Sequence, residues 1–387
     1  MPAAPTPIEM LDRLVAFDTV SRHSNTALIA FVADYLRGHG LAPTIVPNED
    51  GSKANLWVTI GPEQAGGACL SGHTDVVPVD GQAWDGDPFK MVERDGRLYG
   101  RGTADMKAFP AIALALVPEM LAAPLRRPIH MAWSYDEEVG CLGVRRLIQQ
   151  IGTSLPRPSV VIIGEPTSMK VVSAHKGVFT FQTTVTGHEV HSSQPHRGVS
   201  AVMTAARLVT RLDDMARDRV AAADPACGFD PPPYTTIHVG TIEGGTALNI
   251  VSRHAAFGCD IRHLPDEFPE DIQESFVDWY NRDIVPDMHA VAPDSGIVTE
   301  TMNAVPGLRH EPDSEAETLC RQITGDNEIR TVAFGTEGGL FQDAGMAAVI
   351  CGPGSIDQAH QPNEFIEIEQ IEAGTRFVRA VIARCSA

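Results

Sequence analysis

The chain has 387 residues, of which 43% are hydrophobic and 21% are charged, and its formal net charge is −20. A chain of this length can bury a large core, and we expect it to form two domains rather than one. The acidic balance argues against non-specific nucleic-acid binding, because that activity requires surplus lysine and arginine.

Seven cysteines are scattered along the chain, and none of them forms a C-x-x-C pair. This pattern indicates reduced thiols and excludes a zinc site built from thiolates. No apolar stretch approaches the roughly 20 residues of a membrane span, and the N-terminus lacks the charged-then-apolar pattern of a signal peptide. We therefore expect a cytoplasmic protein with no membrane partner, in which any metal ion is held by histidine and carboxylate side chains.

Several short apolar runs that end abruptly in polar residues predict the strands of a buried sheet. "ACL" leads into "SGHTD", "IHMAW" into "SYDEE", "VVII" into "GEPT" and "AAVI" into "CGPGS", with helical patterns at residues 105–123 and 140–151 between them. Continuous apolar strands that alternate with helices indicate an α/β fold with a mostly parallel sheet flanked by helices. Ligands bind beyond the carboxyl ends of such strands, so these polar residues are expected to meet in one crevice.

A different pattern begins at His175. Residues 178–187 alternate like a half-exposed strand, residues 199–219 and 266–281 have helical patterns, and further strands are expected near "TTIHVGTIEGG", "HAAFGCDIR" and "DMHAVA". This order predicts an α+β two-layer sandwich with one open sheet face. We therefore expect one domain formed by residues 1–174 and 294–387, interrupted by an inserted domain at residues 175–293.

Polar residues at the expected strand ends are candidate metal ligands, although each has an ordinary explanation. His73 and Asp75, in "SGHTDVVP", point to the same side of an extended chain, as in a histidine ligand held by a carboxylate; the H-x-D pair is also common without function. Asp105, in "GRGTADMKA", is equally explained as the N-cap of a helix. Taken alone, Glu165 in "VVIIGEPT" is explained as a surface acid, and His360 in "GPGSIDQAHQPNEF" as an exposed loop histidine.

The stretch "SYDEEVG" places Asp136, Glu137 and Glu138 directly after a buried strand. Burying adjacent carboxylates without a partner is costly, so the alternative is a solvated loop. Two histidines and several carboxylates at one edge of a sheet suit a pair of divalent ions bridged by one aspartate. Glu138 could then bind metal while Glu137, which faces another way, serves as the general base.

The motifs "SGHTDVVP", "GRGTADMKA", "DEEVG", "GEPT", "GHEVHSSQP" and "GPGSIDQAHQPNEF" occur in the order and approximate spacing of the co-catalytic zinc amidohydrolases. The chain resembles this family, which includes acetylornithine deacetylase, succinyl-diaminopimelate desuccinylase and aminoacylase, over essentially its whole length. The resemblance implies an aminopeptidase-like catalytic domain and an inserted domain that dimerises and acts as a lid. It implies two divalent metal ions, expected to be zinc, one held by His73, Asp105 and Glu165, the other by Asp105, Glu138 and His360. Carboxylate-rich sites of this kind also take cobalt or manganese.

The resemblance also implies roles for residues outside the ligand set. Asp75 would orient His73, and Glu137 would be the general base and then the acid. His191 would reach into the partner subunit's site of a homodimer and stabilise the oxyanion. The remaining expected site residues would contact a small-molecule substrate: Asn249 and Arg262 at its carboxylate, although Arg262 could equally be a salt-bridged strand residue, and Thr336 and Glu337 at its acyl or amino-acid part.

The C-terminal part of the chain is most similar to the acetylornithine deacetylase members of that family, with "GTEGGLF" in place of their more usual "GTEAGLF". This resemblance implies hydrolysis of N2-acetyl-L-ornithine to L-ornithine and acetate, a step of arginine biosynthesis. Two alternatives stay open: a sibling deacylase or dipeptidase that acts on another N-acyl amino acid such as N-succinyl-diaminopimelate, and a non-catalytic metal-binding module. Retention of the base and all five expected ligands argues against the second.

Overall fold

The computed structural model describes residues 4–229 and 232–387, and the chain forms two compact units. The first consists of residues 4–174, Leu308–Arg330 and Thr336–Ala387, and the second of His175–Gly307 and Thr331–Gly335. Each unit has its own sheet and its own hydrophobic core. The second unit therefore interrupts the first along the sequence.

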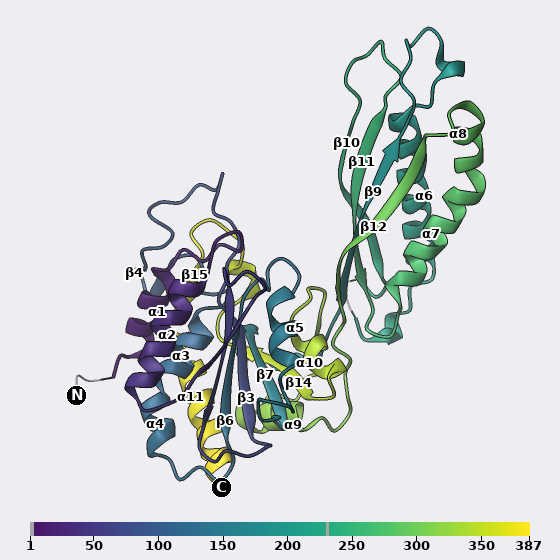
Figure 1. Ribbon diagram of the computed structural model, residues 1–387. Helices are drawn as coiled ribbons and strands as arrows, with labels where there is room; N and C mark the ends of the chain where they lie inside the picture. Colours follow the sequence, from purple (N-terminus) through teal and green to yellow (C-terminus); the bar gives the residue numbers. More distant parts are fainter. Residues whose placement is uncertain (1–3, 230–231) are drawn as a thin grey trace. The chain divides into compact units, whose positions relative to one another are not determined.

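The first unit is built on a six-stranded sheet with the order β1-β2-β6-β3-β7-β14 (Figure 1). The strands are β1 (Thr44–Pro47), β2 (Ala54–Ile60), β3 (Ala68–His73), β6 (Ile129–Ser134), β7 (Val160–Pro166) and β14 (Ala347–Gly352). The last four are parallel to one another, whereas β1 and β2 are antiparallel at one edge. Every residue of β3, β6 and β7 is buried, as expected for strands covered on both faces.

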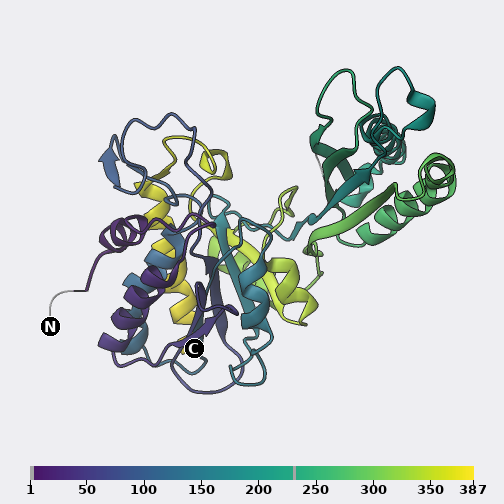
Figure 2. The ribbon, with the colours of Figure 1, turned by 45° about the horizontal axis from the view of Figure 1, so that its top comes forward.

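Helices cover both faces of this sheet, with α1, α2, α3 and α11 on one side and α5 and α10 on the other (Figures 1 and 2). Their bounds are α1 (Pro7–Val15), α2 (Thr26–Gly38), α3 (Ala108–Ala115), α4 (Val117–Ala122), α5 (Leu142–Ile148), α9 (Glu315–Thr324), α10 (Gly338–Asp343) and α11 (Ile368–Ser386). A small second sheet has the order β15-β5-β4, with β4 (Val92–Arg94), β5 (Arg97–Tyr99) and β15 (Phe365–Glu367).

The α3 helix is buried along its whole length, because it packs between the sheet and the helices α1 and α11. Phe109 of α3 lies directly against Gly164 of β7, where a Cβ atom would come within 2.0 Å of the phenyl ring. Only glycine permits this close approach. The contact fixes the start of α3 against β7 next to Glu165.

The second unit is a four-stranded antiparallel sheet with the order β10-β11-β9-β12, covered on one face by helices (Figure 1). Its elements are β9 (Gly177–Thr186), α6 (Ala201–Ala221), β10 (Thr236–Gly244), β11 (His254–His263), α7 (Pro269–Asp283), α8 (Val285–Val291) and β12 (Gly296–Val305). Alternate residues of β9, including Phe179 and Phe181, enter a core that contains Leu208 and Phe276. The expected fold class, α/β with an inserted α+β sandwich, is confirmed.

The segment "DMHAVA" forms helix α8, so the strand that the sequence predicts there is wrong. A proline in its first turn suits a helix start, and Met288 and Ala292 are buried in the same core as α7. The last strand is instead β12, an edge strand whose mostly half-exposed residues give little alternation. The expected return to the first domain at residue 294 therefore falls inside the second unit, which runs to Gly307.

The remaining elements are short. A two-stranded pairing joins β8 (Ala174–His175) to β13 (Thr331–Val332), and single turns of 3-10 helix occur at Pro195–Arg197, Pro225–Cys227 and Ile356–Gln358. Within the described part of the chain, no helix is long and apolar enough to cross a membrane.

Candidate metal centre

The expected ligands and base meet at the carboxyl ends of the parallel strands. His73 is the last residue of β3, and Glu165 lies near the end of β7. Glu137 and Glu138 lie in the loop after β6, which pairs with β3 up to His73 and Ser134. Because β6, β3 and β7 are adjacent and parallel, their carboxyl ends lie at one edge of the sheet, where loops supply Asp105 and His360.

Asp105 lies between the two histidines and offers one carboxylate oxygen to each. Its Oδ1 is 3.1 Å from Nε2 of His73, and its Oδ2 is 3.2 Å from Nε2 of His360. The Nε2 atom of His73 is also 3.8 Å from Oε1 of Glu165, and that of His360 is 3.1 Å from Oε2 of Glu138. Each histidine is thus paired with the shared Asp105 and with one carboxylate of its own.

Asp75 connects His73 to the acidic loop that follows β6. The Nδ1 atom of His73 donates to the main-chain carbonyl oxygen of Asp75 at 2.9 Å, whereas the carboxylate oxygen Oδ1 is 3.6 Å away. The carboxylate of Asp75 instead accepts the backbone N–H groups of Glu137 and Glu138 and the hydroxyl of Ser21. The carbonyl therefore sets the His73 tautomer with Nε2 facing the centre, and the carboxylate holds the two glutamates.

Asp136 turns away from the centre, and this explains three adjacent acids after a buried strand. Its backbone has φ 55°, in the left-handed region, and its carboxylate forms a 2.5 Å ion pair with Lys53. Nζ of Lys53 also donates to the carbonyl oxygen of Ser21. With Asp136 neutralised, Glu137 and Glu138 project from the next two positions toward the histidines.

The carboxyl groups of the centre are crowded and buried, and this shifts their protonation. Burial raises the pKa values of Glu137 and Glu165 well above their usual range. Burial, together with the charge of Asp105, raises the pKa of Glu138 to about 7. Positive charge is therefore favourable at this position.

The two histidines supply part of that positive charge in the ion-free protein. Hydrogen bonds to Asp105 and Glu138 raise the pKa of His360 to about 10. Burial opposes protonation of His73, but the hydrogen bond to Asp105 and the charge of Glu165 still raise its pKa well above 6.5. Burial also disfavours ionised Asp105, yet the hydrogen bonds from both histidines lower its pKa below the usual value.

The donor set fits divalent metal ions. Two overlapping groups, His73 with Glu137 and Glu165, and His73 with Asp105 and Glu138, each place one ligand atom per residue within 4.8 Å of one another. Oε1 of Glu138 is buried and has no hydrogen-bond partner among the described residues, which is costly unless a cation satisfies it. Imidazole nitrogens with carboxylate oxygens are ligands of zinc and similar divalent ions.

Thr336 and Glu337 lie in the interior of the first unit. The Thr336 hydroxyl accepts the backbone N–H of Gly338 at 3.0 Å, at the start of α10. Glu337 is 1% exposed, and its carboxylate accepts the hydroxyls of Ser71 and Ser134, on β3 and β6. Both oxygens of Glu337 are thus bonded to the strands that carry the centre, and a contact of Thr336 and Glu337 with the substrate stays a prediction.

His191 and Asn249 lie side by side in the second unit. The backbone N–H of Ser192 donates to the carbonyl oxygen of Asn249 at 2.9 Å, and His191 forms a β-bridge with Ile250. The Nδ1 atom of the exposed His191 accepts the backbone N–H of Ser193 at 3.2 Å. In the neutral ring the proton is therefore on Nε2, which is a hydrogen-bond donor.

Arg262 is not part of that pair. Asn249 precedes the first residue of β11, whereas Arg262 is next to its last residue, and a ten-residue strand spans about 30 Å. Arg262 forms a two-point ion pair with Asp260 at 2.8 and 3.1 Å. Asn249 and Arg262 thus lie toward opposite ends of β11, and their joint contact with a substrate carboxylate stays a prediction.

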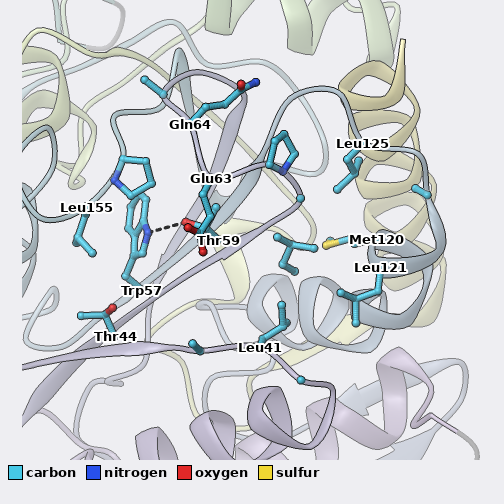
Figure 3. Close-up of a pocket in the computed structure, with 18 of the residues that line it drawn as sticks. Leu41, Thr44, Trp57, Thr59, Glu63, Gln64, Met120, Leu121, Leu125 and Leu155 are labelled. Carbon is cyan, nitrogen blue, oxygen red and sulfur yellow. Dashed lines mark hydrogen bonds between the residues drawn. The ribbon is translucent and has the colours of Figure 1, made fainter.

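A separate cavity of about 840 Å³ lies at the opposite end of the central sheet (Figure 3). Its lining includes Trp57, Thr59, Met120, Leu125 and Leu155, and the Trp57 indole donates to the Thr59 hydroxyl. The end of β2 that borders it pairs with Ile129, the first residue of β6. None of the expected site residues lines this cavity.

Comparison with known proteins places the chain in a family. Residues 69–384 match the model of peptidase family M20/M25/M40, and the chain belongs to that family. It is 33% identical to acetylornithine deacetylase of Pasteurella multocida, with 99% of both chains covered. It is 35% identical to that of Proteus mirabilis, covering 95% of this chain and 94% of the other, and 34% identical to that of Myxococcus xanthus, covering 97% and 96%.

Solved structures of known proteins share the fold. An M20 metallo-carboxypeptidase from Sulfolobus solfataricus superposes with a TM-score of 0.78 at 18% identity, with 99% of both chains covered. A tripeptidase from Staphylococcus aureus gives 0.73 at 19% identity, with 98% of both covered. Together with the sequence relatives and the histidine–carboxylate centre, the family identifies the chain as a metal-dependent amidohydrolase.

Proposed function

We propose that this amidohydrolase removes the acetyl group from N2-acetyl-L-ornithine to give L-ornithine and acetate. The observation that carries the proposal is the arrangement of Asp105 between His73 and His360, with Glu137 beside them. The substrate is supported by relatives named acetylornithine deacetylase that are 33–35% identical over nearly the full chain.

We further propose that the centre binds two divalent ions, zinc or cobalt. His73, Asp105 and Glu165 would hold one ion, and Asp105, Glu138 and His360 would hold the other, in keeping with the pairings of each histidine. When bound, such ions polarise an amide carbonyl and lower the pKa of a water molecule.

Glu137 is the proposed proton carrier. Among the described residues, the carboxylate of Glu137 accepts one side-chain hydrogen bond, a weak one from the Cys141 thiol at 3.4 Å. Its remaining lone pairs can therefore take a proton from the attacking water. Its backbone N–H is fixed by Asp75, which holds the side chain next to the ligands. The same carboxyl group would then pass the proton to the leaving amine.

The second unit would supply the oxyanion donor and the groups that bind the substrate carboxylate. Nε2 of His191 carries the proton in the neutral ring and can donate to an oxyanion. Because His191 and Asn249 lie at the far end of β11 from Arg262, we propose that they act at the site of the partner subunit in a homodimer. Arg262, held by Asp260, would then bind the substrate carboxylate of its own chain.

Steady-state kinetics of the zinc-loaded protein on a panel of amides tests this function. The panel contains N2-acetyl-L-ornithine, N-succinyl-diaminopimelate, N-acetylmethionine and a dipeptide. We expect kcat/KM for acetylornithine to exceed the others by at least about tenfold. A higher value for another member would make the protein a sibling deacylase or dipeptidase with the same metal centre. Absence of turnover with ions bound would contradict catalysis altogether.

A further inference from the structure

Glu364 joins two loops of the metal centre: the loop that carries Asp105, and the loop that carries His360. It lies near the C-terminal end of the loop that carries His360, and its side chain is fully buried. Its oxygen Oε1 accepts the backbone N–H groups of Ala104 and Asp105 at 2.8 and 3.0 Å. Its oxygen Oε2 accepts the N–H of Gly102 at 3.0 Å. One carboxylate thus determines the path of the backbone up to the ligand Asp105.

The charge of Glu364 is neutralised by Arg101, which is also buried. Nη1 of Arg101 is 2.7 Å from Oε2 of Glu364, and the two side chains are 1% and 0% exposed. A carboxylate with a guanidinium and three N–H donors is fully satisfied, which a buried charge requires.

A second set of contacts connects the Arg101–Glu364 pair, here called the clamp, to the backbone of His360. Nη2 of Arg101 donates to Oε1 of Gln82 at 2.6 Å, and Nε2 of Gln82 donates to the carbonyl oxygen of His360 at 3.0 Å. The indole of Trp84 donates to the same Gln82 oxygen at 3.1 Å. Both ligand loops are therefore bonded to one buried ion pair.

The loop needs such support, because His360 and Asn363 have φ values of 63° and 56°. Non-glycine residues adopt this left-handed conformation only where the surrounding structure determines it. Asn363 is itself held through its side-chain oxygen, which accepts the backbone N–H of Asp85 at 3.0 Å.

We infer that Glu364 is a positioning residue of the metal centre, which sets the separation of Asp105 and His360 and hence the affinity of the ion that both would bind. This inference rests on the proposed two-ion centre and does not depend on the substrate. The clamp contacts the loops of both Asp105 and His360, whereas the ion at His73 shares only Asp105 with it. The affinity of the ion at His360 should therefore change more when the clamp is broken.

Isothermal titration of the ion-free protein with cobalt(II), with the absorption spectrum of the bound ion recorded, tests the role of Glu364. In Glu364→Gln, an NH2 group replaces one oxygen, so the side chain loses its charge and cannot accept all three backbone N–H groups while it also accepts from Arg101. We expect the weaker of the two cobalt affinities to fall about 10–100-fold, with a changed visible spectrum, and the tighter affinity to change less.

A matched control is Glu317→Gln, which breaks a largely buried ion pair with Arg321 within α9. It should lower stability without changing either cobalt affinity. If Glu364→Gln fails to fold, Gln82→Ala removes the contact to the His360 carbonyl from a more exposed position and should weaken the second ion alone.

Unchanged cobalt affinities in folded Glu364→Gln, or in Gln82→Ala if the first variant is unfolded, would overturn the inference. Wild-type protein that binds two ions but does not hydrolyse acetylornithine would refute the proposed substrate and leave the positioning role standing. Wild-type protein that binds fewer than two ions would refute the two-ion centre and, with it, the positioning role of Glu364.

Discussion

Glu137 and its neighbours show how one residue's surroundings decide its role. Glu138 contacts His360, and Asp136 pairs with Lys53. Among the described residues, the one side-chain hydrogen bond to the Glu137 carboxylate comes from the Cys141 thiol. Of these three chemically similar acids, Glu138 is a candidate ligand, Asp136 is a structural anchor and Glu137 is the proposed proton carrier. Burial raises the pKa of Glu137, and a raised pKa suits a group that must both take and return a proton near neutral pH.

Glu137→Gln should therefore lose activity and keep its ions. The amide has the size of the carboxylate but cannot accept a proton, so we expect kcat for acetylornithine to fall about 10²–10⁴-fold. Metal analysis of the same preparation should give the wild-type content. A variant with normal turnover, or one whose activity loss follows loss of metal, would contradict the role of Glu137 as base.

Glu337 gives a pH dependence that can be isolated from other groups. Burial raises its pKa to about 7 from a usual 4.5, so the folded ion-free protein binds this proton more tightly than the unfolded chain does. The group's contribution to stability is therefore greatest below pH 4.5 and is lost as the pH rises through 7. We therefore compare the unfolding free energy of Glu337→Gln with that of the wild type at two pH values. We expect the difference, variant minus wild type, to increase by up to about 3 kcal/mol from pH 5 to pH 8.

Urea unfolding of both ion-free proteins at the two pH values measures this difference, and the subtraction cancels groups that the two proteins share. The same difference at both pH values would show that Glu337 is ionised normally.

Some residues of the centre could be named from the sequence and others could not. His73, Asp105 and His360 stand in short motifs at strand ends or glycine-rich loops, where ligands are expected. Glu364 also stands in such a motif, yet nothing local distinguishes it from a surface acid, because its partners Arg101 and Gly102 are more than 250 positions away. The sequence likewise gives no sign that Glu337 is bonded to Ser71 and Ser134, because these residues lie on strands more than 200 positions away.

At the scale of elements, the loop after β6 depends on a contact from the start of β2. Lys53 immediately precedes β2 and pairs with Asp136, with 15% and 13% of the two side chains exposed. This pair holds the turn from which Glu137 and Glu138 project.

Lys53→Met should destabilise the protein, because it leaves the Asp136 carboxylate largely buried without its partner. We expect a loss of about 1–3 kcal/mol in unfolding free energy, recovered in part by Lys53→Met combined with Asp136→Asn. Urea denaturation of the three variants measures the coupling between the two residues. Additive effects of the two substitutions would show that the pair does not matter for stability.

Strands buried on both faces were predictable because continuous apolar runs mark them, as in β3, β6 and β7. The edge strand β12 was not, because one face of its sheet is open and its residues Thr299–Thr301 are polar and mostly exposed. The α8 segment resembled a strand because a helix of seven residues, of which only Met288 is buried, is too short for a clear period in the sequence.

At the scale of the whole molecule, two units of one chain carry different parts of the proposed chemistry. The proposed ligands of the metal ions all lie within the first unit, whereas His191 and Asn249 belong to the second. If they serve the partner subunit's site, neither subunit is active alone.

Mixed dimers of two inactive variants test this division. His191→Ala should lower kcat about 10²–10³-fold, and Glu137→Gln should be inactive for a different reason. In dimers refolded from equal amounts of both, half are mixed and contain one intact site, so about a quarter of wild-type activity should return. No recovery would place His191 and Glu137 of the same chain in one site.

The most direct test of the account is the number of divalent ions that the chain binds at equilibrium, measured by dialysis against zinc and elemental analysis. We expect two ions per chain in the wild type, one in His360→Ala and none held tightly in Asp105→Ala, since Asp105 faces both histidines. Fewer than two ions in the wild type, or two ions retained without Asp105, would contradict a centre built around a shared aspartate.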